Sequence, residues 1–425
     1  MKPLHELTGV EAATAIAAGT ITSEALVSAC LARIAAREAD VRAWEYLDPE
    51  QALRQARACD QTPHRGPLHG VPVGIKDLID TVDMPTTYGS PIYAGYRPAW
   101  DAACVALLRE AGAVILGKTV TTEFAMFMPG KTANPHHPGH TPGGSSSGSA
   151  AAVADGMVPL ALGTQTAGSI IRPASFCGVV GYKPTHGQFA LAGIKALSQT
   201  LDTLGGFARS VADLALLRAV FVSGSAPIPA LSQPPRIGLC QTPQWSHADA
   251  ATRTALERAG AQLEAAGAVV RPVELPKDFT ELAAAQETIQ IFEGARCCAY
   301  ELHTHRAQLS AKLLELLAPA EGITYTAYAE ALALAATCRR QLQAVFTEHD
   351  VLLVPSAAGE APAGLDATGN PLFNRMWTLL HTPAISLPGQ TGAAGLPVGV
   401  QVIGPLGMDE RLLAIAAWIH PRLAV

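Results

Sequence analysis

Serine, threonine and glycine are unusually dense in residues 141–187 of this sequence. Two parts stand out, the run GGSSSGS at 143–149 and the segment TQTAGS at 164–169. A serine hydroxyl becomes a nucleophile when a base removes its proton and hydrogen-bond donors stabilise the oxyanion that forms. Small residues also let the backbone approach a substrate closely. The stretch is therefore interpreted as an active site that carries a nucleophilic serine.

Such a serine needs a base. Thirteen histidines are present, but none lies in a motif that pairs it with Ser145, Ser146 or Ser169. Lys76 is an unusual candidate because it follows the apolar run VPVGI at 71–75. Burial among such neighbours lowers the pKa of a lysine from about 10.4 and favours the neutral form that can accept a proton. Taken alone, Lys76 fits a snorkelling surface side chain better.

The elements around these residues must position them. Residues 71–77 are predicted as a short apolar strand, and the polar segment 130–144 as a loop that leads to the serines. A helix from Ser149 to Ala154, capped by a hydroxyl, and a strand at 158–163 are predicted next. The serine run is thus expected where a loop enters a helix.

Two plainer explanations of the serine run remain open at this point. Gly144 to Gly148 fits GxSxG, the nucleophile elbow of α/β-hydrolases, but that elbow must follow a strand and HHPGHTPG at 136–143 is not one. A run of glycine and serine is also typical of a flexible loop without chemistry.

Helix and strand patterns alternate along the chain, which is typical of an α/β protein. The expected segments are a helical packing segment (1–60), a catalytic core (65–222), a linker-like stretch (223–235), a helical region (280–347) and a return to the sheet (348–425).

Three blocks occur in order: PVGIKD at 72–77, GGSSSGSAAAVA at 143–154 and TAGSIIRPASFCGVVGYKP at 166–184. In order and spacing they resemble the amidase signature family of serine hydrolases, and the resemblance runs over nearly the whole chain. It implies a single large α/β/α domain, with a twisted mixed β-sheet covered by helices on both faces. The helical region 280–347 would border the substrate funnel.

The resemblance also implies roles for individual residues. Ser169 would be the nucleophile, Ser145 a bridging serine preceded by a cis peptide bond, and Lys76 the base. The oxyanion would be bound by the backbone of four residues, Thr166, Ala167, Gly168 and Ser169.

The sequence departs from the common family pattern at Ser147, Gln165, Ala167 and Arg172, the last one position later than the usual arginine. Ala167 fits an oxyanion loop only if its φ is negative. None of these departures removes a member of the triad, so they leave the substrate open. Candidates for substrate binding are Met126, Phe127, Met128, Ser146 and Trp377, with Asn374 beside them; core packing explains the methionines and the phenylalanine equally well.

Composition excludes several classes of function. A net charge of −6 without a basic cluster argues against nucleic acid and membranes as partners, which favours a small molecule. The N-terminus has no apolar signal core, so a cytoplasmic protein is expected. No cofactor or metal is expected, because His136, His137 and His140 lack matching partners. Eight scattered cysteines predict free thiols, with Cys177 as a packing residue, and a homodimer is left open.

The predicted function is hydrolysis of the carbon–nitrogen bond of a small carboxamide through a seryl acyl-enzyme, extending to aryl esters or carbamates. Three alternatives stay open: a carbamate or urea-type hydrolase resembling urethanase or allophanate hydrolase, the glutaminase subunit of a tRNA-dependent amidotransferase, and a non-catalytic binding protein.

Overall fold

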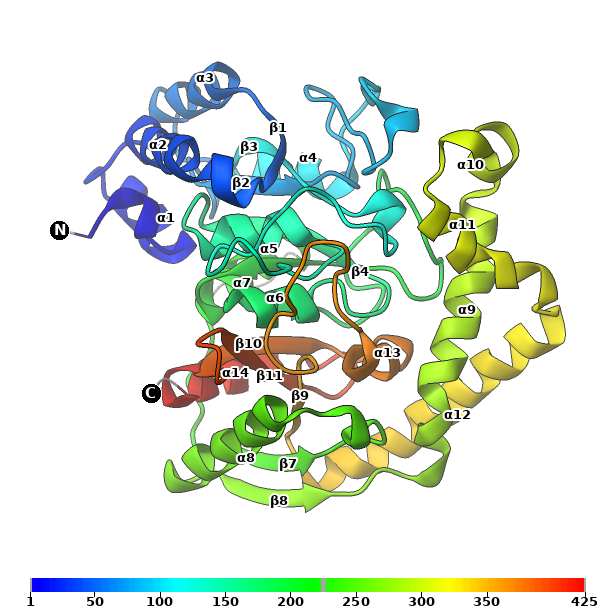
Figure 1. Cartoon of the computed structure of the whole chain (residues 1–425). Helices are drawn as coiled ribbons and strands as arrows, with labels where there is room; N and C mark the ends of the chain where they lie inside the picture. The colour runs from blue at the N-terminus through cyan, green and yellow to red at the C-terminus, as the bar shows by residue number, and fades with distance from the viewer. Residues whose placement is uncertain (1, 223–226, 424–425) are drawn as a thin grey trace.

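The computed structural model describes residues 2–222 and 227–423. Its strands are β1 (Trp44–Leu47), β2 (Pro72–Lys76), β3 (Val114–Thr119), β4 (Leu160–Gln165), β5 (Val180–Lys183), β6 (Thr203–Ala208), β7 (Arg236–Cys240), β8 (Val269–Val273), β9 (Val351–Pro355), β10 (Ala384–Thr391) and β11 (Pro397–Ile403). They form one 11-stranded sheet in the order β1-β3-β2-β4-β6-β5-β10-β11-β9-β7-β8, which runs from the top to the bottom of Figure 1.

The sheet is mixed. β2 pairs in parallel with β3 and β4, and β7 pairs in parallel with β8 and β9. The remaining neighbours, such as β4 with β6 and β10 with β11, are antiparallel. Every residue of β2, β3 and β4 is buried, as expected for strands covered on both faces. β2 therefore carries Lys76 into the interior of the protein.

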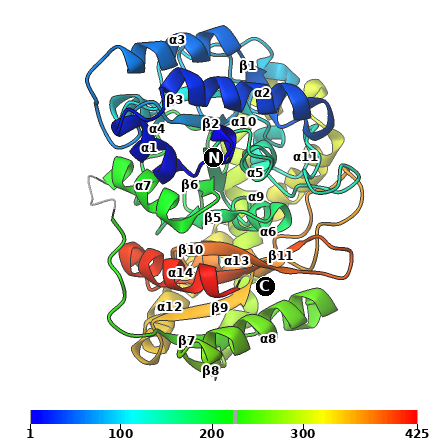
Figure 2. The ribbon, with the colours of Figure 1, turned by 90° about the vertical axis from the view of Figure 1, so that its left-hand side faces the viewer.

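Helices cover both faces of this sheet. They are α1 (Gly9–Ala17), α2 (Ser23–Val41), α3 (Pro49–Asp60), α4 (Ala103–Glu110), α5 (Ser147–Ala154), α6 (Ile171–Cys177), α7 (Val211–Val222), α8 (Ala250–Ala265), α9 (Leu282–Cys297), α10 (Ala299–Thr304), α11 (Ala311–Leu317), α12 (Tyr325–Glu348), α13 (Leu372–Leu379) and α14 (Asp409–Leu423). Figures 1 and 2 place α5 and α6 on one face and α7 and α14 on the other. The predicted single α/β/α domain is confirmed. Across the described ranges, no helix has both the length and the apolar character needed to cross a membrane.

The N-terminal helices begin where their capping residues predict. Thr8 accepts a hydrogen bond from Glu11 N, and Thr22 accepts one from Ala25 N. Asp48 does the same for α3, with Pro49 at its first position. The predicted helical region 280–347 is also confirmed, because α9 to α12 fill it.

Some elements differ from the expectations. α5 begins at Ser147, not Ser149, and its N-cap Ser146 makes no capping bond because its hydroxyl bonds to Thr164 O instead. The sequence shows no clear helix or strand pattern for four elements of the structure, which are β1, β6, α6 and α13. In β6 the glycines weaken the strand signal but are required by packing, since a Cβ at Gly205 would lie 2.1 Å from Tyr182 O.

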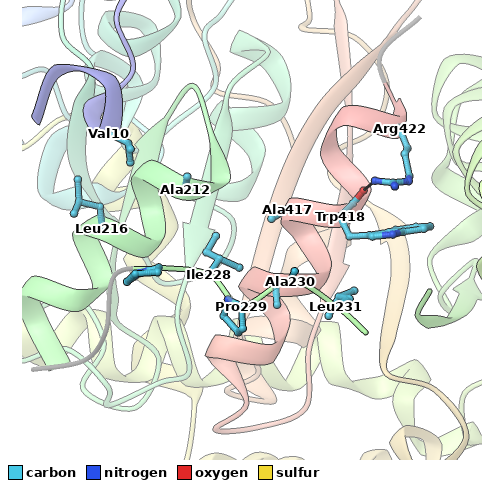
Figure 3. Close-up of a pocket in the computed structure, with 12 residues that line it drawn as sticks. Val10, Ala212, Leu216, Ile228, Pro229, Ala230, Leu231, Ala417, Trp418 and Arg422 are labelled. Carbon is cyan, nitrogen blue, oxygen red and sulfur yellow. Dashed lines mark hydrogen bonds between the residues drawn. The ribbon is translucent and has the colours of Figure 1, made fainter. Parts of the chain in front are cut away.

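The linker-like stretch 223–235 does not divide the chain into two domains. Its residues 223–226 lie outside the described residues. Residues 227–231 line an apolar pocket against α7 and α14, where Ile228 and Leu231 lie near Trp418 and Leu216 (Figure 3). Residues 227–231 therefore pack against the single domain that is built around the sheet.

Candidate active site

Lys76 lies at the end of β2 and is fully buried. Its Nζ lies 2.7 Å from Ser145 Oγ and 2.8 Å from Thr164 Oγ1. Thr164 belongs to β4, the parallel neighbour of β2, so the sheet itself sets the spacing between these side chains. The lysine predicted from sequence and the first serine of the glycine-rich run are thus in direct contact.

The environment of Lys76 favours its neutral form. Burial lowers the pKa of Lys76 to about 7, and the nearby Asp202 opposes this shift only in part. Asp202 is half-buried; desolvation of its carboxylate raises its pKa to about 6, although hydrogen bonds from Thr166 and two backbone amides act in the opposite direction. A substantial fraction of Lys76 is therefore neutral near pH 7 and able to accept a proton.

Ser145 is held by an unusual backbone. The peptide bond between Gly144 and Ser145 is cis, as the family resemblance implied. Gly143 has φ 83°, a region that favours glycine, and its carbonyl accepts a bond of 2.8 Å from Ser147 Oγ. Arg172 Nη2 donates to Gly144 O at 2.7 Å. The hydroxyl that meets Lys76 is thus fixed through its own backbone.

The other serines of the run support the structure. Ser146 Oγ donates to Thr164 O at 3.2 Å, and Ser149 Oγ donates to Leu162 O at 2.7 Å. Both side chains are fully buried against β4. Ser146 does not line the cavity described below, so the expectation that it binds substrate is wrong.

Residues 166–169 connect β4 to α6 and present the nucleophile candidate. All four carbonyl oxygens of this loop are held: Thr166 O by Gln286 Nε2 (2.9 Å), Ala167 O by Thr378 Oγ1 (2.7 Å), Gly168 O by Arg172 N (2.9 Å) and Ser169 O by Ser146 N (3.4 Å). Within the described ranges, none of the four backbone amides of this loop donates a hydrogen bond. The carbonyl oxygens of the loop are therefore bonded to neighbouring groups, whereas its backbone N–H groups stay available to bind an oxyanion.

The unusual residues of this loop have physical explanations. Ala167 is absent from the positive-φ residues, so the condition for its acceptance is met. Gln165 Oε1 accepts bonds from Ile170 N and Ile171 N at 2.9 and 3.0 Å, which orders the start of α6. Gly168 must be glycine because an added Cβ would lie 2.4 Å from Asn374 Oδ1.

A small cavity of about 10 Å³ joins these parts. It is lined by Ala125, Met126, Phe127, Ser145, Thr166, Ala167, Gly168, Ser169, Arg172, Gln290 and Pro371. Ser169 Oγ has no hydrogen-bond partner in the part of the chain that the structure describes, so it is free to meet a substrate here. The structure thus brings both predicted serines, the predicted oxyanion residues and two predicted pocket residues to one place.

Three predicted binding residues lie elsewhere. Met128 is 40% exposed and does not line the cavity. Trp377 is completely buried in an apolar cluster with Leu352 and Ile403, so it cannot form the rim of a funnel. Asn374 is also buried, where it packs against Gly168. The local sequence could not predict whether these side chains face the cavity, because burial in a core depends on the neighbouring elements.

Several residues of the site were missed. Thr164 bonds to Lys76, whereas Gln286 and Thr378 hold the loop 166–169. Gln290 lines the cavity. Thr164 stands inside the signature and could have been noticed as a hydroxyl at a strand end. The others come from α9 and α13 and carry no local motif.

Cys177 is a packing residue, as predicted. It is fully buried, its Sγ donates to Pro142 O at 3.3 Å, and burial raises the pKa of its thiol. All eight cysteines are free. His136 bonds to the carbonyl of Cys177, and the described residues contain no group of three or more His, Cys, Asp or Glu side chains arranged to hold a metal.

Comparison with known sequences agrees with this geometry. The sequence model of the Amidase family matches residues 25–413. A glutamyl-tRNA(Gln) amidotransferase subunit from Chloroflexus aggregans is 36% identical, covering 98% of this chain and 96% of its own. The corresponding subunit from Streptomyces coelicolor is 32% identical over 99% of this chain and 98% of its own.

Solved structures share the fold over the whole chain. A crystal structure of an amidase superposes with a TM-score of 0.91 at 33% identity, covering 98% of this chain and 100% of that one. The peptide amidase of Stenotrophomonas maltophilia gives a TM-score of 0.83 at 32% identity, covering 99% and 98%. A 6-aminohexanoate cyclic dimer hydrolase gives 0.87 at 27%, covering 99% and 97%. The chain therefore belongs to the amidase family and is an enzyme that acts on amide carbon–nitrogen bonds.

Proposed function

We propose that this enzyme hydrolyses the carbon–nitrogen bond of a small carboxamide through a covalent seryl intermediate. Ser169 is the nucleophile, Ser145 transfers protons and Lys76 is the base. The observation that carries this proposal is the buried contact of 2.7 Å between Lys76 Nζ and Ser145 Oγ, at a lysine whose pKa is lowered to about 7.

Proton transfer follows from this contact. Neutral Lys76 accepts the proton of Ser145 Oγ, and Ser145 accepts the proton of Ser169 as Ser169 attacks the substrate carbonyl. Ser145 and Ser169 line the same cavity, so we expect a bound substrate to complete the path of the proton between their two hydroxyl groups. The amides of residues 166–169 then stabilise the negative charge on the carbonyl oxygen.

The second half of the reaction reverses the proton path. Ser145 returns a proton to the leaving nitrogen, so that the amine departs and the acyl group stays on Ser169. Water then attacks the ester carbonyl, with Lys76 and Ser145 accepting its proton, and the carboxylic acid is released. The same steps serve an aryl ester or a carbamate, because Ser169 attacks a carbonyl in each of them and Ser145 can return its proton to a leaving oxygen as well as to a leaving nitrogen.

Active-site labelling tests the proposal directly. A fluorophosphonate is expected to form one adduct at Ser169, because this serine alone combines a free hydroxyl with the open amides. Digestion and mass spectrometry locate the adduct. A label on Ser146 or Cys177 would contradict the assignment of the nucleophile.

A second candidate follows from the relatives named as subunits of glutamyl-tRNA(Gln) amidotransferase, which match almost the full chain. In that case the substrate would be glutamine, and the enzyme would need partner subunits. Assaying the isolated chain against glutamine, aliphatic amides, aryl amides and carbamates separates the two. Efficient turnover of simple amides without a partner favours the first candidate.

A further inference from the structure

Arg172 lines the active-site cavity and has guanidinium donors without a hydrogen-bond partner among the described residues. Its Nη2 donates to Gly144 O at 2.7 Å and to Thr368 Oγ1 at 3.1 Å. Its Nε and Nη1 are buried and have no hydrogen-bond partner among the described residues. The side chain is only 2% exposed and lines the cavity together with Ser145 and Ser169. Two donors of this buried cation therefore lack acceptors, in a residue that lines the same cavity as Ser145 and Ser169.

No carboxylate of the described residues compensates this charge. Arg172 takes part in none of the ion pairs found among them, and the charged neighbour that most affects it is another cation, Arg375. Burial, and then Arg375, lowers the pKa of Arg172 to about 9, which still leaves the group charged at neutral pH. Arg375 itself is engaged with Gln286 and with Glu287, so it does not need the same partner.

A buried charge without a partner is costly, and a buried donor without an acceptor adds to that cost. Natural proteins tolerate this mainly where a ligand completes the arrangement. A guanidinium suits a carboxylate especially well, because its donors are fixed in one plane and the hydrogen bonds are charge-assisted.

The position of Arg172 identifies which part of the substrate it would meet. The leaving amine must depart and water must enter, so the amine side of the site has to open to solvent. Arg172 is almost fully buried, which places it at the closed side, where the acyl group stays during the covalent stage. Arg172 follows Ser169 by three residues and donates to the carbonyl of Gly144, the residue before Ser145. Only a few atoms therefore fit between the substrate carbonyl and the guanidinium.

We infer that Arg172 binds a carboxylate on the acyl part of the substrate, so that the preferred substrates are monoamides of short dicarboxylic acids. This inference rests on the function proposed above, with Ser169 as the nucleophile. The product would be the free dicarboxylate, and the balance of the hydrolysis is unchanged: water adds its hydroxyl to the acyl carbon and its proton to the leaving nitrogen.

A substrate series on the intact enzyme tests the inference. Monoamides of three-, four- and six-carbon dicarboxylic acids are compared with their methyl esters and with uncharged aliphatic amides of the same length. We expect kcat/KM to be about 100-fold higher for the short acidic substrates than for their neutral counterparts. Equal or faster turnover of the neutral amides would overturn the inference, as would a preference that rises with chain length.

Inhibition gives a second readout on the unmodified enzyme. Sodium succinate is expected to compete with the substrate and to slow labelling of Ser169 by a fluorophosphonate, because its carboxylate occupies the guanidinium. Succinamide, which has the same carbon chain but no carboxylate, is the matched control. Protection by succinate no stronger than by succinamide would contradict a carboxylate site.

Variants then distinguish binding from structural support, since Arg172 also holds Gly144 O. Arg172→Gln should lower the preference for acidic over neutral substrates about 100-fold, and Arg172→Lys should restore part of it. Loss of rate on all substrates alike would assign Arg172 to structural support only. Arg339→Gln is the control, because Arg339 bonds to Leu379 O and does not line the cavity.

Labelling separates the two proposals. If wild-type Ser169 is labelled and amides are hydrolysed without any preference for acids, the inference fails and the proposed function stands. If Ser169 is not labelled, the proposed function itself fails.

Discussion

The active site is assembled from two regions that contribute differently. The first region, residues 72–172, supplies the proposed reacting groups Lys76, Ser145 and Ser169 from one strand and two loops. The second region, residues 286–378, supplies no reacting group but holds the oxyanion loop from outside, through Gln286 and Thr378. The chemistry is therefore local in sequence, whereas its positioning comes from helices α9 and α13 far along the chain.

This division has a physical cause. A serine, its proton acceptor and its oxyanion donors must lie within hydrogen-bond distance of one substrate carbonyl, and neighbouring strands provide that spacing directly. A loop whose amides must stay free cannot bond to itself, so its carbonyls need partners from elsewhere. Substitutions in the first region should therefore cost more activity than substitutions in the second.

The largest effect is expected for Ser169→Ala in the first region. Removal of a nucleophile lowers kcat by about 10⁶-fold in comparable serine hydrolases, and the other serine that lines the cavity, Ser145, is engaged by Lys76. Turnover of a small amide and circular dichroism measure activity and folding. Ser149→Ala is the matched control, since Ser149 Oγ bonds to Leu162 O and Thr119 Oγ1 and does not line the cavity, so the variant should retain most activity.

Lys76→Met should come next, with acylation slowed about 10³- to 10⁴-fold because no base remains for Ser145. The rate of fluorophosphonate labelling measures this step. Lys183→Met is the control, because burial lowers the pKa of Lys183 to about 7 as well, but its Nζ bonds to Pro184 O and Thr382 O rather than to a serine. Similar losses in both variants would mean that Lys76 acts through stability alone.

The pH profile tests the same base. The pKa of Lys76 lies near 7, below its ordinary value, and only the neutral form accepts a proton. Activity should therefore increase as the pH rises through about 7 and fall about tenfold per pH unit below it. Asp202, with a pKa near 6, interacts with Lys76 and titrates within the lower part of this limb. A kcat/KM that stays flat from about pH 5 to about pH 8 would exclude Lys76 as the base.

The smallest effect is expected in the second region. Thr378→Val removes the donor to Ala167 O and the acceptor for Gln165 Nε2, so the loop loses one anchor. We expect kcat to fall about 10-fold with little change in KM, because the oxyanion forms only in the transition state. Thr382→Val is the control, since Thr382 Oγ1 bonds to Trp377 O away from the loop. A loss as large as that of Lys76→Met would erase the difference between the two regions.

Prediction from sequence succeeded where the signal was local. The strand that ends at Lys76 and the helices of 280–347 follow from short-range patterns. It failed where burial or partners decide the role. Trp377 and Ser146 are polar-tipped or hydroxyl residues in suggestive positions, but both are packed into the interior.

The sequence alone identifies the family and predicts the reacting groups proposed here, because nucleophile, bridge and base need particular residue types in a fixed order. The tertiary structure is needed to establish which hydroxyl contacts Lys76, which loop amides remain free and which cation lacks a partner. These properties depend on what surrounds each group. Arg172 illustrates the difference. The sequence shows an arginine in the signature, but only the structure shows that two of its donor atoms have no acceptor nearby.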